Sequence, residues 1–187
     1  MKKSTIIFSI IGVVVLFVVI YCVASYNSLV TADVAVTTQW AKVETQYQRR
    51  VDLIPNLVAS VKGVMKQEQT IFDAIAEART RYSGAQTLND KVAGASALDG
   101  AIGRLLVITE NYPQLGSNKN ASDLMAELAG TENRISVERS RFNDAVQVYN
   151  LKVMRFPGSM MARMFGFAER PYFKSADGAQ YVPQVNI

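Results

Sequence analysis

The strongest hydrophobic pattern in the chain is an uncharged run near its amino end, IIFSIIGVVVLFVVIYCVA, which covers the 19 residues of Ile6–Ala24. As a helix this run is about 28 Å long, close to the roughly 30 Å hydrocarbon core of a bilayer. Lys2 and Lys3 precede the run, and the next cation is Lys42. Because cytoplasmic flanks are enriched in cations, we expect a single-pass membrane protein with a cytoplasmic amino terminus. The rest of the chain then lies on the periplasmic or extracellular side.

A cleaved secretory signal is the alternative interpretation of this run. Cys22-Val23-Ala24 resembles a small-residue cleavage site, but signal cores usually contain about 7–15 apolar residues. A lipoprotein signal needs a small residue before the cysteine, where this chain has Tyr21. We therefore expect a retained anchor.

Beyond Val30, apolar residues recur every three or four positions, which predicts helices, with no useful strand pattern before Tyr172. The three stripes are Ile54, Val58, Val61, Met65, Phe72, Ile75 and Tyr82; Leu88, Val92, Ala95, Leu98, Ile102, Leu105, Thr109 and Tyr112; and Leu124, Leu128, Ile135, Phe142, Val146, Tyr149 and Val153. The links 82–87 and 113–122 are short and favour antiparallel neighbours. Asn120 or Ser122 is expected to cap the third helix. The fold class predicted is all-α, a transmembrane helix followed by an elongated antiparallel bundle.

The first helix of this bundle is expected to be long and kinked. Its periodic pattern extends from Val30 to Tyr82, interrupted by Pro55, which removes a helical hydrogen bond. Asp52 can cap a fresh start, so we expect a kink or a brief break at 51–54, without room for a hairpin. At about 80 Å, this helix would exceed the returning third helix of about 48 Å.

This difference in length predicts an uncovered apolar stripe next to the membrane, containing Val30, Val34, Trp40 and Val43. Exposed apolar stripes usually mark an interface, so we expect copies of the protein to pack side by side there. The alternative is that the carboxyl-terminal segment folds back over the stripe.

The carboxyl-terminal segment is rich in methionine and phenylalanine, with Met160, Met161, Met164 and Phe165 in a short adaptable helix. We interpret it first as a cap on the bundle, second as a partner-binding or inter-subunit element, and last as a membrane-surface helix. The membrane is ranked last because the helix lengths place this segment far from the anchor. Residues 175–187 are expected to be an extended tail. The domains expected are therefore 1–5, 6–25 (transmembrane), 26–156 (bundle) and 157–187.

Composition excludes several kinds of chemistry. The net charge is +4, and without Lys2 and Lys3 the balance is 18 cations against 16 anions, mixed along the chain, so no nucleic-acid partner is expected. Cys22 is the single cysteine, so we expect no internal disulfide, although a cross-link between neighbouring anchors is conceivable. The absence of histidine removes the commonest general base and metal ligand. We expect no catalytic residue, no metal and no cofactor.

Several segments together resemble the LemA family of bacterial membrane proteins. They are YNSLV (26–30), YQRRVDLIPNLVASVKG (47–63), EAR (77–79), RLLVITENYPQLGSN (104–118), TENRISVERSRFNDAVQVYN (131–150) and RFP (155–157). Gly116 departs from the expected pattern, where we would expect lysine. The resemblance implies one amino-terminal membrane span, an elongated helical bundle and no catalytic residues. Some members are thought to act near membrane proteases or in envelope upkeep.

The polar residues of these motifs form a candidate structural site. Arg49, Arg50 and Asp52 flank the expected kink, and an arginine fork can hold a carboxylate in fixed geometry. Glu132 and Arg134 are candidates to supply that partner. They are also candidates to pair with Glu68 and Arg79, the two polar residues that interrupt the first stripe. A polar layer of this kind often fixes the register between helices. The full set is Arg49, Arg50, Asp52, Pro55, Asn56, Glu68, Arg79, Glu132, Asn133 and Arg134.

Three functions follow for testing. The leading hypothesis is a membrane-anchored, non-enzymatic helical scaffold of the bacterial envelope, bound to membrane lipid and self-assembling side by side. The alternative is an accessory or adaptor subunit of another envelope protein, such as a membrane enzyme or protease. A third hypothesis, a hydrolase using Glu127, Glu132 and Glu138, needs acids that converge in a pocket.

Overall fold

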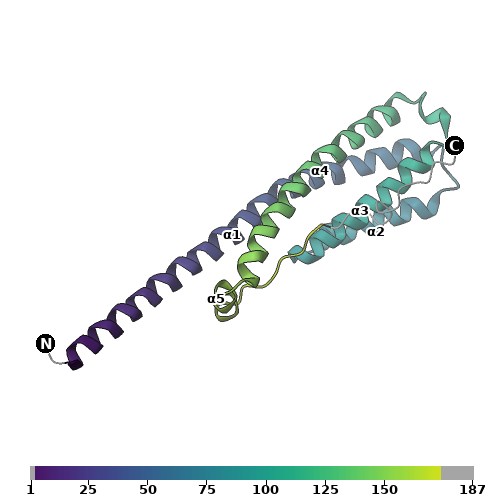
Figure 1. The fold of residues 1–187 in the computed structure, drawn as a ribbon. Helices are drawn as coiled ribbons and strands as arrows, with labels where there is room; N and C mark the ends of the chain where they lie inside the picture. The colour runs from purple at the N-terminus through teal and green to yellow at the C-terminus, as the bar shows by residue number, and fades with distance from the viewer. Residues whose placement is uncertain (1–2, 174–187) are drawn as a thin grey trace, which may run out of the picture. The chain divides into compact units, whose positions relative to one another are not determined.

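The computed structural model describes residues 3–173, with side chains from Ile6 onward. Figure 1 shows the helices α1 (Lys3–Lys62), α2 (Gln69–Gly84), α3 (Leu88–Thr109), η1 (Pro113–Leu115), α4 (Lys119–Met154) and α5 (Gly158–Phe165). No strand occurs among residues 3–173, which confirms the all-α fold. Packing divides the chain into two units. Among the described residues, the first contains 3–39 with Asp144–Arg170, and the second contains Trp40–Asn143 with 171–173. This partition differs from the domains expected from the sequence.

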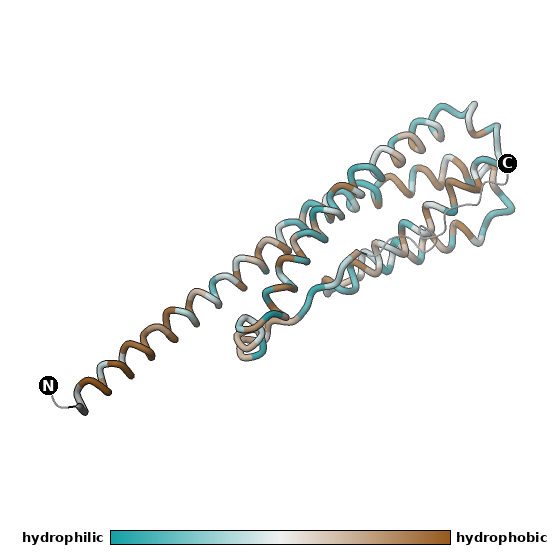
Figure 2. Tube along the Cα trace, in the orientation of Figure 1, coloured by the Kyte–Doolittle hydropathy of each residue, from teal (hydrophilic) through white to brown (hydrophobic). Residues whose placement is uncertain are grey.

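The start of α1 is the most hydrophobic part of the chain (Figure 2). It is long and apolar enough to cross a membrane, and none of its most apolar window is buried inside the protein. The α3 helix passes the same test of length and composition, but its apolar side is packed in the core of the second unit. Thus the amino-terminal helix is the candidate span, as predicted.

The second unit is a four-helix bundle built from the part of α1 that follows Gln39, α2, α3 and the part of α4 that ends at Asn143. Polar contacts between side chains show which of these helices are parallel and which are antiparallel. Arg49 bonds to Glu127 and Tyr47 to Arg139, so α1 and α4 are antiparallel. Glu44 pairs with Lys91 and Arg50 with Asp99, so α1 and α3 are parallel. The bundle is therefore of the up-down-up-down type.

The prediction of one long helix from Val30 to Tyr82 is wrong. The chain turns between Gly63 and Glu68, and α2 begins only at Gln69. Turn hydrogen bonds run from Val64 N and Met65 N to Val61 O, at 3.0 and 2.9 Å. Met65 is fully buried inside this turn, so the apolar spacing continued through a segment that is not helical. A hairpin between α1 and α2 is therefore present where the sequence predicted one continuous helix.

The expected break at residues 51–54 is also wrong. The α1 helix continues through Pro55, and Asp52 does not start a new helix. Its carboxylate accepts a hydrogen bond of 3.0 Å from the Gln48 side chain of the same helix. Pro55 is on the exposed side, where only one backbone hydrogen bond is lost. The kink itself stays a prediction.

The second and third apolar stripes are confirmed as core. In α3 the buried members include Val92, Leu98 and Ile102, and in α4 they include Ile135 and Phe142. The α3 helix begins at Leu88, directly after the link 82–87 that the sequence predicted. Thr87 caps it by accepting a hydrogen bond from Asp90 N at 3.1 Å.

The cap expected for the third helix is displaced by two residues or more. The α4 helix begins at Lys119, and Asn118 is the residue whose side chain accepts a hydrogen bond from Ala121 N, at 3.2 Å. Asn120 and Ser122 therefore lie inside the first turn, not at the cap.

The first unit brings α5 against α1 next to the apolar run. Leu29, Met161 and Ala162 form a buried cluster, with Cys22 and Phe167 packed against it. Lys152 donates a hydrogen bond of 2.7 Å to Ser28 Oγ. The expectation that the carboxyl-terminal segment lies far from the anchor is therefore wrong, because the first helix ends at Lys62 and α4 is long enough to return to Ser28.

A second chain segment completes the first unit. Asn150 is buried and binds the main chain of Arg170 twice, donating to its carbonyl oxygen and accepting from its amide, each at 2.9 Å. The Arg170 guanidinium reaches Asp33 at 2.8 Å. The extended chain after α5 is thus fixed along α4 and α1.

The membrane-near stripe is not open in the way the sequence suggested. Trp40 and Val43 are buried in the second unit, where Trp40 stacks on Phe173 with a centroid distance of 6.0 Å. The alternative of a carboxyl-terminal segment folded back over the stripe describes these residues correctly. Of the other interface candidates, Met161 is buried, Val30 is half-buried, and Val34, Met160, Met164 and Phe165 are exposed. The expected tail, 175–187, lies outside the described residues.

Candidate functional site

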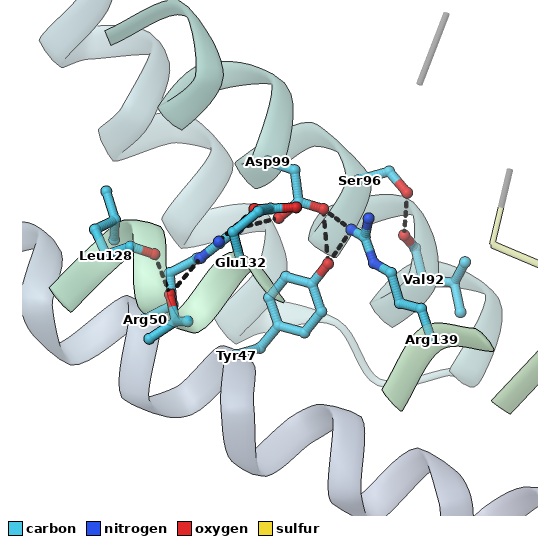
Figure 3. A network of polar contacts seen from close by, with 9 residues as sticks. Tyr47, Arg50, Val92, Ser96, Asp99, Leu128, Glu132 and Arg139 are labelled. Carbon is cyan, nitrogen blue, oxygen red and sulfur yellow. Dashed lines mark hydrogen bonds and ion pairs between the residues drawn. The ribbon is translucent and has the colours of Figure 1, made fainter. Parts of the chain in front are cut away.

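A buried layer of charges lies at the centre of the second unit (Figure 3). Arg50 projects from α1 and is 1% exposed, the largest fully buried side chain among the described residues. Its Nη1 donates to Asp99 of α3 at 2.6 Å, its Nε donates to Thr131 Oγ1 of α4 at 3.2 Å, and its Nη2 pairs with Glu132 of α4. One guanidinium thus joins three helices.

Tyr47 and Arg139 extend the layer by about one turn of α1. The Tyr47 hydroxyl donates to Asp99 Oδ2 at 2.7 Å and accepts from Arg139 of α4. Arg139 also forms an ion pair with Asp99 and lies 4.7 Å from the centroid of the Phe173 ring. Asp99 therefore accepts hydrogen bonds from Arg50 and Tyr47 and pairs with the Arg139 cation, which compensates a carboxylate that is 17% exposed.

Burial shifts the pKa values of two members of the layer, Tyr47 and Arg139. Desolvation raises the pKa of Tyr47 above its ordinary value, and the nearby Arg139 guanidinium opposes this shift only in part. Burial also lowers the pKa of Arg139 from its usual value, against the favourable effect of Tyr47. Tyr47 is therefore a neutral hydroxyl in the folded protein, and it acts as a hydrogen-bond donor to Asp99.

Thr131 completes the layer at the α4 end. Its hydroxyl donates to the Leu128 carbonyl oxygen at 2.6 Å, so its lone pairs are directed at Arg50. The residue is 1% exposed. A threonine is suited to this position because its methyl group packs in the core while its hydroxyl receives the arginine.

This arrangement joins three helices through ion pairs. Asp99 is paired with Arg50 and Arg139, and Glu132, whose side chain is 54% exposed, is paired with Arg50. Within residues 3–173 no cluster of three His, Cys, Asp or Glu side chains is placed to hold a metal ion. The hydrolase hypothesis needs Glu127, Glu132 and Glu138 to converge, but Glu127 pairs with Arg49 and Glu138 with Arg141. The convergence of acids that a hydrolase needs is thus not found.

A surface depression of about 680 Å³ lies beside this layer, but it does not form an enclosed site. Its lining residues are Ala41, Glu44, Thr45, Gln48, Arg49, Asp52 and Leu53. All of them belong to α1, so the depression is an open flank of one helix. A substrate pocket normally encloses most of its ligand between several elements.

The motif residues predicted from the sequence are only partly brought together. Arg50 and Glu132 meet, as proposed. Arg49 instead pairs with Glu127 on the surface at 2.6 Å, and Glu68 accepts a hydrogen bond from the Tyr112 hydroxyl at 3.1 Å. This bond raises the pKa of Tyr112. The remaining members are exposed on α1, α2 and α4: Asp52, Pro55, Asn56, Arg79, Asn133 and Arg134.

Sequence reasoning missed four members of the layer: Tyr47, Asp99, Thr131 and Arg139. Tyr47 begins the quoted segment YQRRVDLIPNLVASVKG, and the available signal was that its hydroxyl needs a partner when buried. Asp99 follows Leu98 directly in the second stripe, beside the core face, which was the available signal. Arg139 stands in the quoted segment VERSRFND, but nothing in its spacing indicates burial.

Comparison with known proteins agrees with the fold and its motifs. The LemA family matches residues 39–187, which is most of the chain and includes every member of the charged layer. This chain belongs to the LemA family. The predicted resemblance is confirmed, and the apolar α1 start together with this membership supports a membrane protein.

Individual relatives are magnetosome proteins. The chain is 27% identical over 175 residues to magnetosome proteins MamQ 1 and MamQ 2 of Paramagnetospirillum magneticum, covering 80% of this chain. It is 28% identical over 174 residues to MamQ of Magnetospirillum gryphiswaldense, covering 79% of this chain. The matched region spans 64% of the length of each relative. None of these names designates an enzyme.

Proposed function

We propose that this LemA-family protein is a membrane-anchored, non-enzymatic scaffold of the bacterial envelope. Residues 6–25 cross the membrane, the amino terminus is cytoplasmic, and the helical bundle stands on the outer side. The cations at Lys2 and Lys3 favour this orientation. The orientation is tested with a fusion, in which a reporter enzyme that is active only outside the cytoplasm is attached after Phe173. The same reporter attached before Lys2 is the control. Activity of the amino-terminal fusion alone would reverse the orientation.

The observation that most supports a scaffold is the mutual pairing of the charged side chains in the layer. Arg50, Asp99, Glu132 and Arg139 form ion pairs that join α1, α3 and α4, so these groups contribute to helix packing in the second unit. The experiment is to replace Glu132 with alanine, which should lower the melting temperature. Unchanged stability together with a lost binding activity would contradict the structural role.

Self-assembly side by side belongs to the same proposal, through exposed residues only. Trp40 and Val43 are in the core, which leaves Val34 on α1 as the exposed member of the predicted stripe. Cross-linking in native membranes of the host tests for copies of the chain. Detection of the monomer alone at all protein densities would contradict self-assembly and leave an anchored monomeric scaffold.

The adaptor alternative differs in what accompanies the protein. A scaffold that assembles with itself is isolated from native membranes with more copies of the chain, whereas an adaptor is isolated with a second protein in fixed proportion. Mild-detergent purification without overexpression therefore separates the two.

A further inference from the structure

The first unit contains an apolar surface that the scaffold proposal does not explain. In α5 the side chains of Met160, Met164 and Phe165 are 64%, 65% and 50% exposed, while Met161 and Ala162 are buried. The adjacent Phe156 is 78% exposed. Residues 160 and 164 are four apart and lie on one side of the helix, so α5 presents exposed apolar side chains beside the exposed Arg163.

This surface lies beside the end of the candidate membrane span. Phe165 contacts Tyr26 of α1 with a centroid distance of 4.8 Å, and Phe167 contacts the same ring at 6.0 Å. Cys22, inside the apolar run Ile6–Ala24, packs against the cluster that contains Met161. Where α1 leaves a bilayer, α5 is therefore at the level of the headgroups.

The segment that contains α5 carries more cations than acids, and the exposed Glu169 follows it directly. Residues 151–168 contain Lys152, Arg155 and Arg163 and no acid, and both arginines are exposed. Apolar side chains together with flanking cations are the composition of helices that lie on anionic membrane surfaces. Clusters of basic residues close to the end of a span likewise bind acidic lipid headgroups.

A groove of about 420 Å³ joins the span to this segment. Tyr21 and Ala24 line it from the apolar run, and Lys152, Arg155 and Phe156 line it from the end of α4 and the turn that follows. One wall thus belongs to the bilayer core, and the other combines cations with an exposed aromatic ring. These properties match a lipid, with its acyl chain along α1 and its phosphate near the arginine.

We propose that α5 and Phe156 lie in the interface of the outer leaflet and bind an anionic lipid surface, with Met160, Met164 and Phe165 inserted below the headgroups. This inference rests on the membrane span of the proposed function. It makes α5 a second membrane contact, which holds the end of α4 at the surface. The occupant is the leaflet, and not a second copy of the chain or another protein.

Depth measurements in nanodiscs test this inference with the full chain. In a Cys22→Ala background, single cysteines at Met160, Met164, Val148 and Val15 are labelled with an environment-sensitive fluorophore. Brominated lipids then quench only labels that contact acyl chains. Val148 is the matched control, because it is 53% exposed on α4 of the same unit but lies outside the apolar surface. Val15, 55% exposed within the run, reports the span itself.

We expect blue-shifted, lipid-quenched emission at Met160, Met164 and Val15, and neither change at Val148. Quenching at Val15 without quenching at Met160 and Met164 would overturn this inference and leave the proposed function intact. No quenching at Val15 would overturn both. Labels on α5 that are shielded from water but not quenched, with shielding that grows with protein density, would identify a second copy as the occupant and overturn the proposal.

The charge is tested separately, with the double variant Arg155→Gln and Arg163→Gln. Quenching at Met164 should be stronger in phosphatidylglycerol than in phosphatidylcholine nanodiscs, and the double variant should abolish this difference. Equal quenching of the unmodified chain in both lipids would overturn the anionic preference. Circular dichroism of each labelled variant confirms that α5 and the bundle are folded.

Discussion

The two units of this chain are stabilised by different physical means. The second unit is organised around Arg50, a buried cation on α1 that bonds to α3 and α4. The first unit contains an apolar cluster around Leu29 and a side-chain clamp on the main chain, made by Asn150. A buried charge network is costly to disturb, because its members cannot recover water when one is removed. An apolar contact or a segment held by a side-chain clamp can instead open locally, while the rest of the chain stays folded. The comparison therefore predicts global sensitivity in the second unit and local sensitivity in the first.

The largest effect is expected for Arg50→Ala. It removes the cation that Asp99 and Glu132 share, and breaking a buried pair costs about 3–5 kcal/mol. We expect a loss at the lower end of this range, because Glu132 is 54% exposed and Asp99 keeps Arg139 as a partner. The measurement is urea unfolding in mild detergent. Arg49→Ala is the matched control one position earlier, because Arg49 and Glu127 are 52% and 41% exposed and such pairs contribute at most about 1 kcal/mol. Equal losses in both variants would contradict the assignment of the network to Arg50.

The next effect concerns the contact between α2 and α3. A Cβ atom on Gly94 would lie 2.9 Å from the Tyr82 Cα atom, which is backbone and cannot turn aside. Gly94→Ala should therefore separate the two helices and destabilise the second unit by about 1–3 kcal/mol. The control is Gly100→Ala in the same helix, where nothing lies within 4 Å of the new atom. This variant should raise stability by about 0.5–1 kcal/mol, since alanine is the better helix former.

The clamp of the first unit is expected to give a smaller, local effect. Asn150→Ala leaves the Arg170 amide and carbonyl without their partners, which costs about 1–3 kcal/mol. Hydrogen exchange at the Arg170 amide should accelerate, while amides in the core of α3 keep their protection. The exposed Asn133→Ala is the control. Loss of protection throughout the bundle would show that the two units do not respond separately.

The smallest effect should appear only at alkaline pH. Burial raises the pKa of Tyr47 in the folded chain, so its contribution to stability is complete below the unfolded value of about 10. It is lost as pH rises from there through the folded pKa, because the unfolded tyrosine ionises first. Tyr47→Phe should make the alkaline decline less steep, although Tyr82, whose pKa burial also raises, retains its own part. Unfolding curves at several alkaline pH values measure this slope.

The sequence was most informative where apolar periodicity and secondary structure coincide. The stripes of α3 and α4 correctly predicted core residues such as Leu98 and Phe142. The same rule failed at the turn after Lys62, because Met65 is buried in a non-helical turn at a position that also fits a helix. Gly63 and the polar residues that follow it indicated a turn, but a rule based on apolar spacing alone does not consider them.

That single error determined the misplacement of α5. A first helix extended to Tyr82 left α4 too short to return to the anchor, so a membrane role was ranked last. With the turn in place, Val30–Lys62 is close in length to α4, and Lys152 reaches Ser28.

The charged layer could be predicted only in part, for a different reason. Family motifs contain Arg50 and Glu132, whereas the burial of Asp99 and Arg139 arises from packing between helices distant in sequence.

Cys22 makes the chain its own reporter. It is the single thiol, half-buried against the cluster formed by Leu29, Met161 and Ala162. Detachment of α5 from α1 should therefore raise the rate of its alkylation, in an unmodified protein and in a native membrane.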